Sequence, residues 1–174
     1  MKTVYILRHA KSDWGDPAVK DHERPLNERG RSAAPQMGAY LKAKKYKPDL
    51  ILCSTARRTV ETCELIKPFV GARTPVVFED ALYLAEARQI GERLRWLDED
   101  VDAVMVIGHN PGLAQLAIAL SAAAKSADDA KLHERMREKF STCALAVIEF
   151  GAKSWRDVKM GTGALKDFMR PKEL

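Results

Sequence analysis

Three short runs of polar residues could together bind and transfer a phosphoryl group. The first holds Arg8 and His9, the second holds Arg58, and the third holds His109. Arginine offers a planar fork of N–H donors that matches phosphate, and a neutral histidine can act as a nucleophile or a base. A pocket with these two arginines and two histidines would bind phosphate, and one histidine could attack it.

The elements around these residues should bring them to one edge of a sheet. Residues 4–7, 50–53 and 102–107 are short apolar runs typical of buried strands, and each precedes one of the polar runs. In open α/β sheets, ligands bind at the carboxyl ends of strands. Helices are expected to follow the second and third strands, and helix N-termini also favour anions.

The rest of the chain alternates strands with helices, which predicts one α/β domain over residues 1–174 with a largely parallel sheet. Asn27 is a candidate N-cap for the first helix. The expected helices cover 28–45, 54–66, 85–97, 113–123 and 131–139, and the further strands cover 75–78 and 142–150, with 155–160 as a hairpin partner. Residues 10–26 and 124–130 are expected to be loops, and the tail 161–174 a loosely packed end.

The bulk composition is that of an ordinary soluble globular protein, with 174 residues, 46% hydrophobic and 30% charged. The net charge of +5 favours anionic ligands, but no aromatic interleaving or motif indicates nucleic acid. No apolar run predicts a membrane span, and no signal peptide is visible. The three scattered cysteines match neither a disulfide framework nor zinc spacing, which favours free thiols in the cytoplasm. The sequence does not indicate the oligomeric state.

Other phosphate chemistries fit these residues less well. Cys53 lies at a strand–helix turn like a cysteine phosphatase nucleophile, but the arginine expected six residues later is replaced by Thr59. No glycine-rich loop ending in Gly-Lys-Ser/Thr is present, which disfavours a nucleotide triphosphate. His9 and His109 have no carboxylate at ligand spacing, so no metal site is predicted.

The three runs, in this order, resemble the histidine phosphatase superfamily, which also contains cofactor-dependent phosphoglycerate mutases. The runs Arg8–Ser12 and Asp21–Gly30 are similar to those of its small SixA-type phosphohistidine phosphatases. The resemblance implies a phosphoglycerate mutase-like three-layer α/β/α sandwich, a phosphorylated intermediate on His9, and no cofactor.

The resemblance also implies that Arg8, Arg58 and His109 complete the phosphate pocket. Either Arg57 or Arg58 could point inward, and family spacing from Ser54 selects Arg58. Ser12 and Asn110 are expected to contribute to phosphate or substrate binding. We expect His22 and His133 to be solvated and Tyr83 to be a packing residue. Trp14 could face substrate or pack on its loop.

The sequence departs from the mutase pattern at the proton donor. Mutase-like relatives place a carboxylate in the segment that follows the strand expected here at 75–78, behind a leucine, whereas this chain has Leu82-Tyr83-Leu84 with Asp80 and Glu86 nearby. A phosphorylated imidazole needs less help to leave than an alkoxide. This difference favours phosphorylated protein histidine as substrate. The alternatives are a small phosphomonoester, or a phospho-ligand binding module without turnover. Only residues 10–26 and 121–130 are expected to form walls above the pocket.

Overall fold

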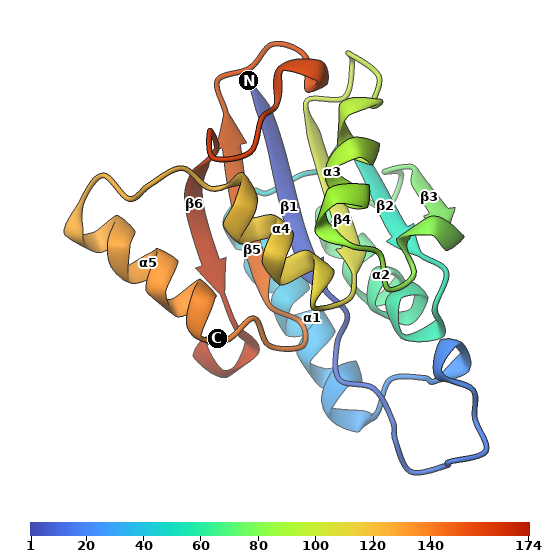
Figure 1. Cartoon of the computed structure of the whole chain (residues 1–174). Helices are drawn as coiled ribbons and strands as arrows, with labels where there is room; N and C mark the ends of the chain where they lie inside the picture. The colour runs from blue at the N-terminus through green and yellow to red at the C-terminus, as the bar shows by residue number, and fades with distance from the viewer.

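A six-stranded sheet forms the middle of the computed structural model, which describes all 174 residues (Figure 1). The strand order is β3-β2-β4-β1-β5-β6. β1, β2, β3 and β4 pair in parallel, and β5 and β6 add antiparallel partners beside β1. The strands are β1 (Lys2–Arg8), β2 (Leu50–Ser54), β3 (Val76–Glu79), β4 (Ala103–Gly108), β5 (Leu145–Phe150) and β6 (Ala164–Met169).

Helices cover both faces of this sheet. α1 (Glu28–Ala43) and α2 (Arg57–Val70) lie behind it in Figure 1, whereas α3 (Ala87–Arg95) and α4 (Gly112–Leu120) lie in front, with α5 (Ala127–Glu138) beside β6. Successive strand residues face opposite layers, so Val4 and Ile6 belong to one hydrophobic cluster and Tyr5 and Leu7 to the other. The predicted three-layer α/β/α sandwich is therefore confirmed. No helix has the length and apolar character needed to cross a lipid bilayer.

The start of α1 is fixed by its cap and by a close backbone approach. The side chain of Asn27 accepts a hydrogen bond from the Gly30 amide, as the N-cap pattern predicts. A Cβ at Gly30 would lie 2.2 Å from the Lys11 carbonyl oxygen, so only glycine lets the helix meet this loop. α1 continues past Pro35 to Ala43.

The C-terminal part of the chain differs from the sequence prediction. Residues 155–160 form no strand, since Trp155–Asp157 is a 3₁₀ turn, and β6 lies within the tail that was expected to be loose. β6 pairs along β5 and buries Leu165 and Phe168 in the core. The alternation of β6 was hard to read because Lys166 and Asp167 interrupt its apolar residues and the β5–β6 register shifts at Val147/Ile148.

The last helix also begins earlier than expected. α5 starts at Ala127, because the Ser126 side chain caps it by accepting a hydrogen bond from the Asp129 amide. The predicted loop therefore ends at Ser126. His133, expected to be solvated, is only 3% exposed, with its Nε2 3.3 Å from Asp129 Oδ1. α5 packs against β6, which explains why its inner face is buried.

Candidate active site

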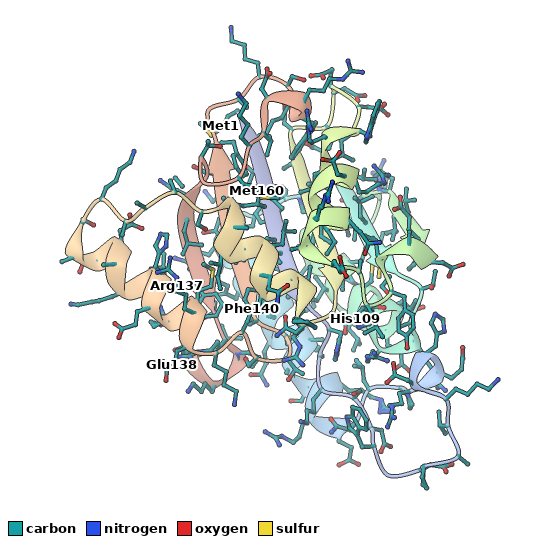
Figure 2. All side chains as sticks on the ribbon, viewed as in Figure 1. Met1, His109, Arg137, Glu138, Phe140 and Met160 are labelled. Carbon is teal, nitrogen blue, oxygen red and sulfur yellow. The ribbon has the colours of Figure 1, made fainter.

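The carboxyl ends of β1, β2 and β4 meet at one edge of the sheet. Arg8 pairs with Gly108 in the parallel register of β1 and β4, so His9 and His109 follow adjacent strands. Their ring centroids lie 5.3 Å apart. Figure 2 shows His109 at this end of the sheet. The expected residues converge on a hollow of about 410 Å³ that is lined by Arg8, His9, Ser12, Arg58, His109 and Asn110.

A hydrogen bond orients the His9 ring and leaves its Nε2 without a proton. Its Nδ1 lies 2.7 Å from the Ala10 carbonyl oxygen, and a carbonyl can only accept, so Nδ1 carries the proton. The Ala10 amide in turn donates to Thr62 Oγ1 at 3.0 Å, which fixes this turn of the backbone. Burial lowers the pKa of His9 to about 4. At neutral pH the ring is therefore uncharged, with a lone pair on Nε2.

His109 is also buried and uncharged. Its Nε2 lies 2.8 Å from Ser54 Oγ at the end of β2, and its Nδ1 is buried without a hydrogen-bond partner. Burial, together with the neighbouring His9 and Arg58, lowers the pKa of His109 to about 3. The site thus holds two imidazoles that stay neutral, while Arg8, Arg58 and the Lys11 side chain, which also lines the hollow, carry the positive charge.

Arg58 is oriented by Asp21 from the loop before α1. Arg58 Nη1 donates to the Asp21 carbonyl oxygen at 2.7 Å, and Nη2 donates to Asp21 Oδ2 at 3.1 Å. The Tyr83 hydroxyl donates to the same carboxylate oxygen. The Tyr83 hydroxyl and Arg58 hold the pKa of Asp21 below its usual range, so this carboxylate is ionised.

Arg8 is oriented from the opposite side by the segment that follows α5. Its Nη1 donates to the Phe140 carbonyl oxygen at 3.1 Å, and its Nε is buried without a partner. Burial, with Arg58 nearby, lowers the pKa of Arg8. Since the side chain remains a guanidinium at neutral pH, Arg8 and Arg58 give the hollow the charge and the donors that a phosphate dianion requires.

Comparisons with known proteins agree with this geometry. The family model of the histidine phosphatase superfamily (branch 1) matches residues 4–83. An uncharacterized protein of Mycobacterium tuberculosis is 37% identical over 166 residues, which cover 95% of this chain and 100% of the relative. The chain belongs to the histidine phosphatase superfamily.

Solved structures place it in the SixA-type branch. A provisionally assigned phosphohistidine phosphatase SixA from Agrobacterium tumefaciens superposes with a TM-score of 0.80 at 29% identity, with 98% of each chain covered. The protein histidine phosphatase SixA complexed with tungstate shares the fold, with a TM-score of 0.77 at 23% identity over 98% of this chain and 97% of that one. The chain is therefore a SixA-type histidine phosphatase, which is an enzyme of the phosphatase class.

In this histidine phosphatase, the two weaker site candidates also reach the hollow. Ser12 is 4% exposed, and it pairs with Leu26 across the loop. The Asn110 amide is already engaged, because its Nδ2 donates to the Phe140 carbonyl at 2.8 Å and its Oδ1 accepts from the Ala114 amide at 3.3 Å. Asn110 thus ties the start of α4 to the segment that holds Arg8.

Several residues at the site were not assigned to it from the sequence: Lys11, Leu84 and Thr142 line the hollow, Asp21 orients Arg58, and Tyr83 packs on His109. Asp21 lines the hollow directly, and Tyr83 sets its ring edge against His109 with centroids 5.4 Å apart. The hydrogen bond between Tyr83 and Asp21 joins the loop 10–26 to the segment after β3. No sequence pattern in either segment predicts this contact. His22, expected to be solvated, also packs on Tyr83 and places its Nε2 3.0 Å from Thr55 Oγ1.

The walls of the hollow differ in part from the expectation. Loop 10–26 contributes Trp14, which is 65% exposed and lies under the Arg24 guanidinium at 3.5 Å. Residues 121–130 do not line the hollow, which is instead bordered by Leu84 and Thr142. The reason is the direction of α4, which begins beside the site and runs away from it (Figure 1), so that the segment after it lies at the other end of the sheet, where Ser121 pairs with Gly163 before β6.

The alternative nucleophile and the acid candidates lie outside the hollow. Cys53 is fully buried within β2, and its shared hydrogen bond with Cys63 together with burial raises the pKa of its thiol. Asp80 accepts a hydrogen bond from Thr55 Oγ1 at 2.5 Å, and Glu86 caps α3. Neither carboxylate lines the hollow, which leaves Asp21 as its one carboxylate.

Proposed function

We propose that this phosphatase hydrolyses phosphohistidine in proteins through a phosphorylated His9, without a metal ion. The observation that carries the proposal is the tautomer of His9. Nδ1 is committed to the Ala10 carbonyl, so the lone pair of the neutral ring is on Nε2. A neutral imidazole nitrogen is the form that can attack phosphorus.

In the first step, His9 Nε2 forms a bond to phosphorus while the P–N bond of the substrate breaks. The substrate imidazole leaves as a neutral ring when its own second nitrogen is protonated. Arg8 and Arg58 stabilise the charge on the equatorial oxygens of the phosphoryl group. A bound dianion also favours protonation of His109, whose buried Nδ1 has no other partner, so His109 can donate to a phosphoryl oxygen.

In the second step, water attacks phosphorus and the bond to His9 breaks. The products are inorganic phosphate and the original His9, and the proton lost by water remains on phosphate. Apart from the attacking water and the proton that the substrate imidazole carries, the groups used in both steps are protein side chains. No set of three His, Cys, Asp or Glu residues is placed to hold a metal ion, and the proposal uses none.

The state of the carboxylate in the hollow favours a leaving group that brings its own proton. Asp21 is kept ionised by Tyr83 and Arg58, so it is a poor acid for an alkoxide. A phosphorylated imidazole does not need that acid. We therefore rank phosphohistidine above a small phosphomonoester, and above a binding module without turnover.

The test combines covalent trapping with substrate comparison. A ³²P-labelled phosphohistidine peptide should transfer an acid-labile, base-stable label to the enzyme, and His9→Ala should carry none and should lose turnover while remaining folded. The histidine control His22→Asn should still be labelled. Label on His9→Ala would eliminate His9 as the nucleophile.

Substrate class is decided by kcat/KM for the phosphohistidine peptide, 3-phosphoglycerate and simple sugar phosphates, with and without EDTA. The proposal expects the peptide to be the fastest substrate and EDTA to have no effect. A faster monoester would favour a small-molecule phosphatase, and loss of activity in EDTA restored by a divalent cation would contradict the metal-free mechanism.

A further inference from the structure

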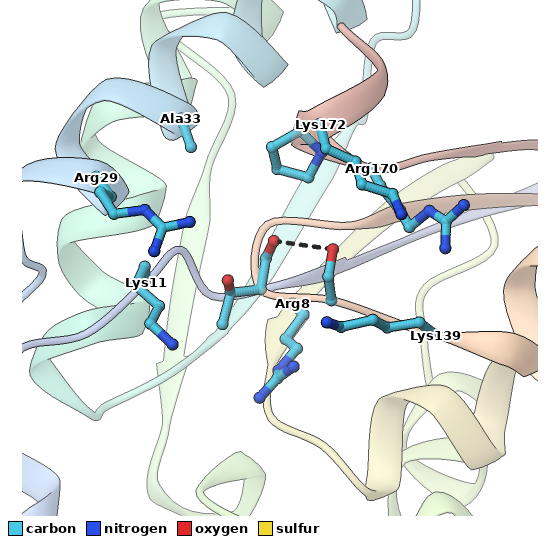
Figure 3. Close-up of a pocket in the computed structure, with 10 residues that line it drawn as sticks. Arg8, Lys11, Arg29, Ala33, Lys139, Arg170 and Lys172 are labelled. Atoms are coloured by element: carbon cyan, nitrogen blue, oxygen red, sulfur yellow. Dashed lines mark hydrogen bonds between the residues drawn. The ribbon is translucent and has the colours of Figure 1, made fainter.

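A second hollow of about 330 Å³, called here the basic groove, lies beside the active site. Figure 3 shows Lys11 and Arg29 on one side of it and Lys139, Arg170 and Lys172 on the other, with Arg8 between them. None of its lining residues is acidic or aromatic. Its cationic residues are Arg8, Lys11, Arg29, Lys139, Arg170 and Lys172.

Arg170, at the end of β6, is the buried member of this set. It is 5% exposed, and its Nε and Nη2 donate to Glu173 Oε1 at 3.3 and 2.7 Å. Its Nη1 is buried and has no hydrogen-bond partner. Because this nitrogen has no accessible surface, a ligand in the groove meets the positive charge of Arg170, partly neutralised by Glu173, and not a free donor. Glu173 already demonstrates that a carboxylate fits one side of its fork.

The basic groove is continuous with the active site. Arg8, Lys11 and Thr142 line both hollows. Lys139 extends toward Arg8 in Figure 3. One ligand can therefore span both hollows, with its phosphoryl group beside His9 and a second anionic group in the basic groove.

We propose that the basic groove binds carboxylate side chains of an acidic segment next to the phosphohistidine of a protein substrate. This inference rests on the proposed function, and it specifies the substrate class. The lack of an aromatic residue leaves no platform for stacking a nucleobase. Most of the cations are exposed lysines and arginines on long stems, namely Lys11, Arg29, Lys139 and Lys172.

The long, exposed cationic side chains of the basic groove suit a flexible peptide better than a second phosphate held in one position. Dedicated phosphate sites commonly use backbone N–H groups at a helix N-terminus or in a nest. The groove has neither such backbone donors, since Pro171 in its lining has no N–H, nor the buried, fixed arginines of the neighbouring phosphate pocket apart from Arg8 and the Glu173-paired Arg170. Long side chains can adjust to carboxylates at varied positions along a peptide.

The experiment compares two phosphohistidine peptides that differ only in their flanks, Asp and Glu in one and Asn and Gln in the other. Each exposed ion pair contributes roughly a 1.5- to 5-fold factor, so kcat/KM should favour the acidic peptide by about fivefold to tenfold at low salt. The preference should shrink as salt is raised. It should fall to near unity in Lys139→Glu/Lys172→Glu.

The matched control is Lys125→Glu/Lys153→Glu, which makes the same change in net charge at exposed lysines outside both hollows. It should keep the wild-type preference. Equal kcat/KM on both peptides, or an equal loss of the acidic-peptide preference in both double variants, would overturn the proposed role of the groove. Neither result would contradict the proposed function. A bisphosphorylated sugar that outperforms the acidic peptide and depends on Lys139 and Lys172 would also overturn this assignment.

If neither peptide is hydrolysed, the proposed function fails and the groove is tested separately. Binding of the acidic peptide without its phosphoryl group is then measured by fluorescence anisotropy. Binding that is lost in Lys139→Glu/Lys172→Glu but kept in the control double variant would still support a site for carboxylates. No binding to the wild type would overturn it.

Discussion

The two buried histidines should make the protein lose stability on mild acidification. His9 is 7% exposed and His109 is 3% exposed, with pKa values of about 4 and about 3. An unfolded histidine has a pKa of about 6.5. The folded pKa lies below the unfolded one, so the unfolded state binds more protons as pH falls. Stability is therefore lost below pH 6.5, and the loss levels off below the folded pKa.

The size of this effect follows from proton linkage. Between pH 7 and pH 5, each histidine should cost about 2 kcal/mol of unfolding free energy. Part of the His109 shift comes from His9, so the two contributions are not independent and together should reach about 3–4 kcal/mol. The carboxylates with lowered pKa values, such as Glu173 and Asp21, lose their contribution mainly below this range.

The assay is urea unfolding at pH 7, 6 and 5, followed by the fluorescence of the fully buried Trp155. Substitution to glutamine removes one titrating group, so His9→Gln and His109→Gln should each lose about 2 kcal/mol less than the wild type between pH 7 and 5. His22→Gln is the control outside the buried pair. If both buried-site variants lose as much stability as the wild type, the histidine pair is not the source.

Three further outcomes are expected. Asp80→Asn and Glu86→Gln should change the phosphohistidine rate little, since neither carboxylate lines the hollow, and a large loss of kcat/KM in either would give it the acid role. Asp21→Asn should bind inorganic phosphate severalfold more tightly, measured as product inhibition, because a negative charge leaves the pocket. Weaker binding would mean that Asp21 acts chiefly by orienting its arginine. Phe168→Ala should lower the free energy of unfolding in urea by about 3–5 kcal/mol, because the ring is fully buried. The exposed control Lys166→Ala should change it little, and a loss below 1 kcal/mol for Phe168→Ala would contradict a packed tail.

The part of the site that lies at strand ends could be predicted from the sequence. His9, His109 and the serine at the end of β2 follow apolar runs whose parallel pairing forces their carboxyl ends together. Family spacing selected Arg58 over Arg57; in the structure, Arg58 lines the hollow and Arg57 pairs with Glu61 on the helix surface. These features depend on local pattern and sheet topology.

Asp21 could not be found in this way because its position depends on contacts distant in sequence. Its loop is pinned by the Ser12–Leu26 bridge, by Gly30 against Lys11, and by the Leu26 amide on Glu61. The error at His133 also comes from a contact distant in sequence. His133 was expected to be solvated because the prediction lacked β6, the strand against which α5 packs and buries this side chain.

The parallel register between β1 and β4 gives this enzyme a built-in reporter of correct folding. Arg8 faces Gly108 across the pair, and the His9 amide donates to the Gly108 carbonyl at 3.1 Å. A slip by one residue would shift one histidine along the strand by about 3.3 Å and turn the alternating side chains toward the opposite layer. Such a chain could keep its secondary structure and still lose the opposed imidazoles. Recovery of turnover during refolding would therefore time strand alignment, which circular dichroism alone does not resolve.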